Sequence, residues 1–136
     1  MGYRPEHFEL YELVPEDIYN DVSHNILWGL FDDSILRAID ELRDRFGPAW
    51  INNWYWGGDY QYSGLRPFSY EFGAKYSLHK YARAFDIKFN WFTALEVRRY
   101  LKEYPNSLVT RIENKVNWLH IDRKNTQSDQ TIFFNP

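Results

Sequence analysis

The chain has 136 residues, no cysteine and a formal net charge of −3 at pH 7. This length suits one domain with its own hydrophobic core, so we expect a single domain over residues 1–136. The absence of cysteine excludes disulfides and thiolate chemistry, and charges of both signs are interspersed without the basic stripe that nucleic-acid binding needs.

The N-terminal segment is expected to be irregular and, over residues 1–32, to wrap the domain, because Pro5 and Pro15 interrupt any long element. Its first residues lack the apolar run of a signal peptide, and no stretch of the chain is apolar enough to span a bilayer. We therefore expect a protein made in a cytoplasm, which would leave the cell by lysis or inside a particle.

A helix is predicted from Ser34 to Phe46, because apolar residues recur there at helical spacing. Asp32 or Asp33 can cap its start, and Gly47-Pro48 ends it. The next run, Trp50 to Trp54, has the composition of a strand.

The second half of the chain predicts three strands and a helix. Residues Arg83 to Phe89 alternate, which puts Phe85, Ile87 and Phe89 on one face and Ala84, Asp86 and Lys88 on the other. A helix begins at Thr93 with a capping box to Glu96, ends at Pro105 and is expected to bury Val97, Tyr100, Leu101 and Tyr104. Strands Ser107–Glu113 and Val116–Asp122 follow, joined at Asn114-Lys115 as a tight hairpin. The fold class is α+β, a small antiparallel sheet with helices packed against it.

Two histidines and an aspartate are the candidate metal ligands. If Arg83–Phe89 and Val116–Asp122 are neighbouring strands, Asp86 and His120 point from the same face, and His79 arrives from the preceding turn. Two imidazoles and a carboxylate form the ligand set of an open zinc site, whereas structural zinc sites are closed and rich in cysteine. Manganese or nickel could also bind to these ligands. A histidine taken alone is more commonly a surface residue or a core residue than a metal ligand.

The order and spacing of three motifs carry a family resemblance. Ser63-Gly64-x-Arg66-Pro67, then Ser77-x-His79-x-x-Ala82-x-Ala84-x-Asp86, then Trp118-x-His120-x-Asp122 resemble the zinc D-alanyl-D-alanine peptidase family. That family includes bacterial carboxypeptidases and dipeptidases, and phage endolysins that cut the peptide part of peptidoglycan. The resemblance covers residues 33 to 123 and implies a hedgehog/DD-peptidase-like fold.

The resemblance also implies roles for individual residues. It makes His79, Asp86 and His120 the ligands of a zinc ion. It makes Arg66 the group that holds a substrate carboxylate or carbonyl, since a guanidinium fork suits bidentate recognition. Without the motif, Arg66 would instead be interpreted as a turn arginine paired with an acid such as Asp59 or Glu71.

Two positions depart from the family pattern. Ala82 replaces a glycine, which costs little if its backbone angles are ordinary. Asn117 stands three residues before His120, where the family commonly carries an acidic general base, and an amide cannot accept a proton from water. In the predicted hairpin Glu113 lies opposite Val116, on the face of His120, so Glu113 is the candidate replacement unless it is only a solvated hairpin residue.

These observations favour a zinc-dependent peptidase that cleaves the peptide part of peptidoglycan, a phage endolysin or cell-wall-entry enzyme found in the host bacterial cytoplasm or the virion. The alternative is a catalytically weak or inactive metal-binding module of a virion or tail, which contacts the wall or other virion proteins. A third possibility is a resemblance of fold alone, without a metal.

Overall fold

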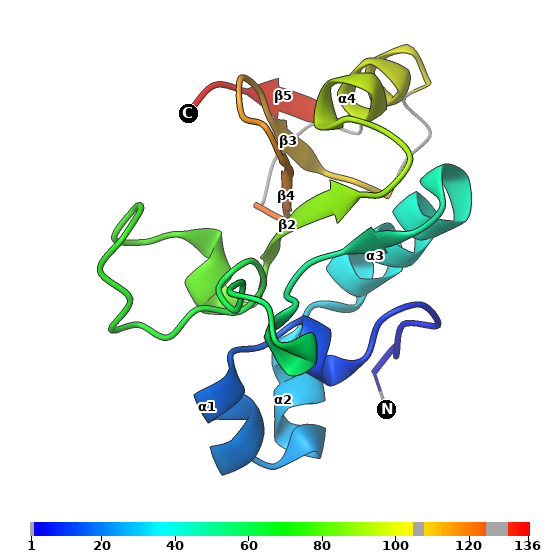
Figure 1. Cartoon of the computed structure of the whole chain (residues 1–136). Helices are drawn as coiled ribbons and strands as arrows, with labels where there is room; N and C mark the ends of the chain where they lie inside the picture. The colour runs from blue at the N-terminus through cyan, green and yellow to red at the C-terminus, as the bar shows by residue number, and fades with distance from the viewer. Residues whose placement is uncertain (1, 105–107, 125–130) are drawn as a thin grey trace.

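The computed structural model describes residues 2–104, 108–124 and 131–136. Within them the chain is α+β, with four α-helices and a five-stranded mixed sheet (Figure 1). The helices are α1 (Glu16–Asp21), α2 (His24–Leu30), α3 (Asp33–Phe46) and α4 (Ala94–Glu103). The strands are β1 (Ala49–Trp50), β2 (Ala84–Phe89), β3 (Arg111–Glu113), β4 (Leu119–Asp122) and β5 (Ile132–Phe134), in the spatial order β1-β2-β4-β3-β5.

The sheet is mixed, which corrects the expected antiparallel one. β1, β2, β4 and β3 pair antiparallel, but β5 pairs parallel to β3. The sequence after Asp122 predicts no strand, because the three residues of β5 are too few to show a period. Pro105 and Ser107, the predicted ends of a helix and a strand, lie outside the described residues.

The two faces of the sheet differ in chemistry. Side chains alternate along a strand, and the apolar set joins the core with α3: Phe85, Ile87, Ile112, Leu119 and Ile121. The other set is polar: Asp86, Arg111, Glu113, His120 and Asp122. Figure 1 shows α3 and α4 on one side of the sheet and the loop before β2 on the other. The polar face therefore carries the side chains that could form a functional site.

The two longer helices confirm their predictions. Asp32 caps α3 by accepting a hydrogen bond from the Ser34 amide, and Gly47 (φ 79°) follows its last residue. Thr93 and Glu96 form the capping box of α4. The burial of Tyr100 and Tyr104 was predicted wrongly: both are largely exposed, and Tyr100 packs its ring edge-on against Phe46.

The N-terminal segment is more regular than expected. The short helices α1 and α2 follow a 3₁₀ turn at Leu10–Glu12, and Pro15 begins α1 as its N-cap instead of interrupting it. Proline is tolerated there because the amide it lacks would have no partner inside the helix. At six and seven residues, these helices are too short for a clear apolar period.

The predicted strand Trp50 to Trp54 is only partly formed. β1 ends at Trp50, and a 3₁₀ turn occupies Trp54–Trp56. Asn52 explains the difference, because its side chain donates to the Val14 carbonyl and accepts from the Ser63 amide. Asn52 is thus bonded to the N-terminal segment and to Ser63 instead of to a strand of the sheet.

The connection between β3 and β4 is longer than the predicted hairpin. Arg111 pairs with Asp122, whereas a two-residue turn would have paired it with Trp118. Because the register moves by an even number of residues, each side chain keeps its face. Continued by one residue, the observed register puts Glu113 opposite His120.

Two contacts hold this connection away from a tight turn. The Asn114 amide donates to the Phe134 carbonyl of β5 at 2.6 Å. The Arg98 guanidinium of α4 donates to the Val116 and Trp118 carbonyls at 2.8 and 2.9 Å. Both partners are distant in sequence, so the pattern of the hairpin residues alone does not reveal them.

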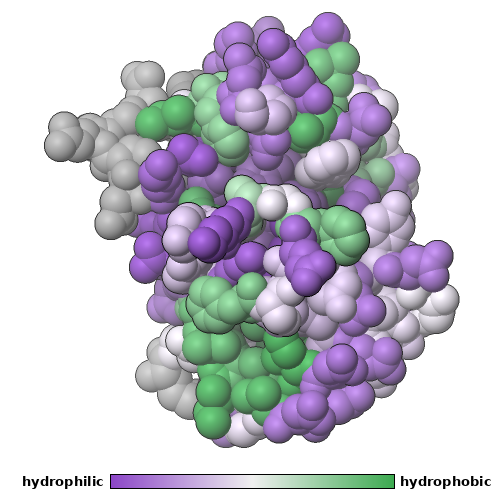
Figure 2. Space-filling view, turned by 90° about the vertical axis from the view of Figure 1, so that its left-hand side faces the viewer, coloured by the Kyte–Doolittle hydropathy of each residue, from purple (hydrophilic) through white to green (hydrophobic). Residues whose placement is uncertain are grey.

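Two hollows lie on the side of the molecule that carries the loop before β2. One is an apolar groove of about 440 Å³ between α1, α2 and residues 65–68. Figure 2 shows an apolar area, coloured green, at the lower end of the molecule, where α1 and α2 lie. The other, of about 600 Å³, lies over the polar face of the sheet. In the described residues no helix has the length and apolarity to cross a membrane.

Candidate metal centre

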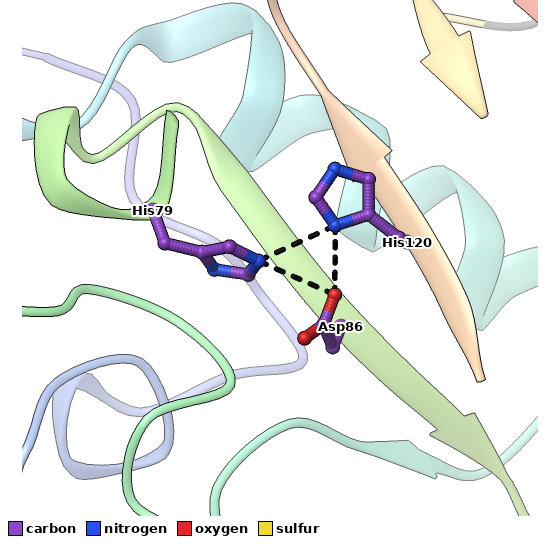
Figure 3. Close-up of side chains that lie close together, drawn as sticks. All are labelled: His79, Asp86 and His120. Carbon is purple, nitrogen blue, oxygen red and sulfur yellow. Dashed lines mark hydrogen bonds and ion pairs between the residues drawn. The ribbon is translucent and has the colours of Figure 1, made fainter. Parts of the chain in front are cut away.

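Three buried side chains that line the larger cavity lie close together, and Figure 3 shows them pointing toward one another. Asp86 comes from β2, His120 from β4, and His79 from the 3₁₀ turn Leu78–Tyr81. Asp86 and His120 are direct cross-strand partners, so the predicted pairing of their strands is confirmed. Within the described residues this is the one group whose ligand atoms could hold a metal ion together.

The separations of the three atoms fit a divalent metal. His79 Nε2 lies 3.3 Å from both Asp86 Oδ1 and His120 Nδ1, and His120 Nδ1 lies 2.8 Å from Asp86 Oδ1. Tetrahedral zinc binds imidazole nitrogen and carboxylate oxygen at about 2.0–2.2 Å, which separates ligand atoms by about 3.3 Å. Two of the distances match this value, and the third is shorter by about half an ångström.

Hydrogen bonds on the far side of each ring determine which nitrogen faces the centre. His79 Nδ1 donates to the Gly64 carbonyl at 2.9 Å, since a carbonyl can only accept. His120 Nε2 donates to the Asp122 carboxylate at 2.9 Å. In the neutral rings, His79 Nε2 and His120 Nδ1 therefore direct lone pairs toward Asp86. Outer partners of this kind orient metal-binding histidines in proteins.

The electrostatics of the cluster favour a cation between these atoms. Burial raises the pKa of Asp86, but the contacts with the two neighbouring imidazoles, His120 and His79, hold it well below its usual range. Burial lowers the pKa of His79, which keeps that ring neutral. Burial also lowers the pKa of His120, but the hydrogen bonds with Asp122 and Asp86 outweigh this and raise it to about 9. A proton on His120 and a metal ion would compete for the same place.

We expect metal binding to release a proton at neutral pH. Below about pH 9 the His120 proton must leave before Nδ1 can bind a metal, so the apparent affinity should rise about tenfold per pH unit from pH 7 to 9. Calorimetry at pH 7 in buffers of different ionisation enthalpy should give about one proton released per zinc. Release of no proton would contradict the coordination through His120 Nδ1.

The loop around Ser63-Gly64-x-Arg66 contacts two of the three candidate ligands. The Ser63 carbonyl accepts from the Asp86 amide at 2.8 Å, and the Gly64 carbonyl accepts from His79. The Arg66 amide donates to the His79 carbonyl at 3.1 Å. The first motif therefore lies next to the second in space, although Gly64 and His79 are 15 residues apart in the sequence.

The N-terminal segment packs so closely over Gly64 that there is no room for a side chain at this position. A Cβ atom there would lie 2.2 Å from the Leu13 carbonyl oxygen. We expect Gly64→Ala to lower the free energy of unfolding by at least about 1–3 kcal/mol, as overpacking does, and to weaken metal binding through His79. Chemical denaturation and calorimetry measure the two effects.

Gly29→Ala is the matched control for this substitution. Gly29 is exposed in α2, and nothing lies within 4 Å of the position of its added Cβ. Alanine should raise the free energy of unfolding there by up to about 1 kcal/mol, because glycine is a poor helix former. An unaltered stability in Gly64→Ala would show that the Leu13 segment can move aside.

Alanine in place of glycine at position 82 was expected to cost little if the backbone angles there were ordinary, and they are not. Ala82 adopts φ 57° and ψ 35°, the left-handed conformation, directly after the turn that carries His79. This conformation costs a residue with a Cβ about 1–2 kcal/mol, whereas glycine adopts it freely. The backbone at Ala82 is therefore locally strained beside the candidate site.

Arg66 lies at the wall of the cavity beside the cluster. Its Nη2 is 3.4 Å from Asp86 Oδ2, its Nε donates to the Tyr62 carbonyl at 2.7 Å, and its guanidinium stacks over the Tyr70 ring. Its acidic partner is therefore Asp86, not Asp59 or Glu71. Contact with Oδ2 leaves Oδ1 directed toward the histidines.

The two candidates for the general base lie in different places. Glu113 lines the cavity, with Oε2 3.9 Å from His120 Nδ1. Asn117 is exposed in the connection between β3 and β4 and is not among the residues that line the cavity. The structure brings Glu113, Arg66 and the three ligands together and leaves Asn117 apart.

Asp122 belongs to the third motif but was not predicted to have a role in the site. It is buried, and burial raises its pKa, but the hydrogen bonds with His120 and Arg111 hold that pKa below its usual value. Its signal was the spacing of two residues after His120, which places both side chains on the same face of β4.

Comparisons with protein-family models, curated proteins and solved structures found no match to this chain.

Proposed function

We propose that this chain is a zinc-dependent peptidase that cleaves the peptide part of bacterial peptidoglycan, with a fold of the hedgehog/DD-peptidase type. The observation that carries the proposal is the convergence of two imidazole lone pairs and one carboxylate on the floor of an open cavity. The motifs around these residues, shared with the zinc D-alanyl-D-alanine peptidases, support the choice of substrate.

Zinc is the metal that this ligand set favours. His79 and His120 offer nitrogen, Asp86 offers oxygen, and an approximately tetrahedral arrangement with three protein ligands is typical of catalytic zinc. When bound, zinc polarises a carbonyl and lowers the pKa of a water molecule to about 7.

Two further residues of the cavity have roles in this proposal. Glu113 accepts a proton on the attacking side and returns it to the leaving amine, since its carboxylate lies 3.9 Å from a ligand atom. Arg66 orients the substrate through its remaining N–H groups, while its contact with Asp86 Oδ2 keeps that ligand in place. Both are held against the floor of one cavity, as positioning of a substrate requires.

Digestion of purified cell walls tests the proposal. Zinc-loaded protein should release new amino groups from peptidoglycan, protein stripped by a chelator should not, and added zinc should restore the reaction. Walls of different cross-bridge types are compared, because the scissile bond depends on the wall. Zinc-loaded protein that releases no amino groups from any wall would contradict a peptidase.

Asn117 favours one second candidate, a metal-binding module of a virion that attaches to the wall without cutting it. The family's base position is occupied by an amide and is exposed. In that case zinc-loaded protein would sediment with intact walls and leave their peptides uncut.

A further inference from the structure

Arg111 on β3 binds Asp122, the residue that accepts the hydrogen bond from the outer nitrogen of His120. Its Nε donates to Asp122 Oδ1 at 2.6 Å and its Nη2 donates to Asp122 Oδ2 at 3.1 Å. Such a bidentate pair fixes the plane of the carboxylate, which a single hydrogen bond would leave free to rotate. Asp122 Oδ2 is also the atom that accepts from His120 Nε2. The orientation of the imidazole therefore depends on the guanidinium.

Phe134 on β5 covers this pair from the side. Its ring lies 4.0 Å from the guanidinium carbon of Arg111, a cation–π distance. The same ring lies 5.9 Å from the His120 ring at an angle of 84°, an edge-to-face contact. The parallel pairing of β5 with β3, in which Phe134 is the partner of Glu113, holds the ring in this place.

We propose that Arg111 and Phe134 are positioning residues of the metal centre, which hold Asp122 in the orientation that keeps His120 Nδ1 directed at Asp86 and His79. The inference rests on the metal site of the proposed function and goes beyond it, because it makes β5 a part of that site. Arg111 acts on His120 through Asp122. Phe134 acts through Arg111 and through its own edge-to-face contact with the His120 ring.

A purely structural role for Arg111 makes a different prediction. If the guanidinium only neutralised the buried carboxylate, a lysine would serve as well, since it carries the same charge. A lysine is a point charge and cannot fix the plane of a carboxylate. Arg111→Lys therefore separates charge from orientation.

The test measures zinc affinity by chelator competition and the visible ligand-field bands of the Co²⁺-loaded protein. Arg111→Gln should weaken zinc binding by about 10- to 100-fold, as the loss of an outer partner does. Arg111→Lys and Phe134→Leu should each weaken it by about tenfold, the low end of that range, and all three should shift the Co²⁺ bands. A loss of fold stability alone would leave the bands unchanged.

Arg123→Gln is the matched control, because it removes the same charge one residue from Asp122, where Arg123 donates to Thr110 instead. Its affinity should stay within about twofold of the wild type, well below the loss expected for an outer partner. Wild-type affinity in Arg111→Lys and Phe134→Leu, or an equal loss in Arg123→Gln, would overturn the inference, even if Arg111→Gln failed to fold. Wild-type protein that binds no zinc would instead overturn the metal site itself.

Discussion

Purified wild-type protein is expected to bind one zinc ion, and replacement of either histidine ligand, as in His79→Ala or His120→Ala, to abolish stoichiometric binding. Each ring supplies one of only three protein ligand atoms, so its loss should exceed the roughly 10- to 100-fold effect of losing an outer partner. In the wild type, zinc at a hundred times its Kd should stabilise the fold by about 2.7 kcal/mol, visible as a higher Tm. Elemental analysis and thermal melts with and without zinc measure both effects.

His24→Ala is the control for this experiment. His24 is exposed in α2 and its ring packs at a tilt against Tyr19, so its removal deletes an imidazole without touching the cluster. It should bind zinc like the wild type and show the same rise in Tm. If His120→Ala still bound one zinc with wild-type affinity, the assignment of the ligands would be wrong.

The strand that carries Asp86 was predictable because its signal is local. Alternation along Arg83 to Phe89 places Phe85 and Ile87 in the core and Asp86 on the opposite face, whatever the neighbouring strands do. The Asp32 cap and the terminal Gly47 of α3, and the capping box of α4, are local signals of the same kind. The alternation of residues and the helix caps were therefore enough to predict β2, α3 and α4, the elements around the candidate site.

Features that depend on distant partners were not predictable in this way. The turn after Glu113 was misjudged because Arg98 of α4 and the backbone of β5 hold it open. The strand β5 itself is too short to show a period, yet its Phe134 covers Arg111. The strain at Ala82 is a property of the backbone, which no composition signal reports.

The general base is the part of the site where sequence and geometry diverge. By motif spacing the base belongs at Asn117, but the observed register leaves that residue exposed and brings Glu113 into the cavity, opposite His120. An even shift in register preserved the face of Glu113 although the predicted partner residues were wrong. The proposed peptidase therefore has its candidate base on β3, at Glu113, and not in the following loop.

Glu113→Gln is expected to lower kcat on peptidoglycan fragments by about 10²- to 10⁴-fold, the usual contribution of a positioned acid or base, with zinc content unchanged. Glutamine keeps the shape of the side chain and cannot accept the proton. Asn117→Asp should leave kcat near that of the wild type, because a carboxylate at an exposed position outside the cavity cannot reach the substrate. Kinetics on zinc-quantified protein compare the three.

The opposite result would assign the base to the loop. If Asn117→Asp raised kcat and Glu113→Gln changed nothing, the connection between β3 and β4 would have to close over the cavity during the reaction, against the hold of Arg98 on the Val116 and Trp118 carbonyls. If the wild type and both variants bound zinc and cut nothing, neither carboxylate would be a base. The retained ligands would then serve wall attachment, since a cavity with three metal ligands and Arg66 can still bind a peptide carbonyl.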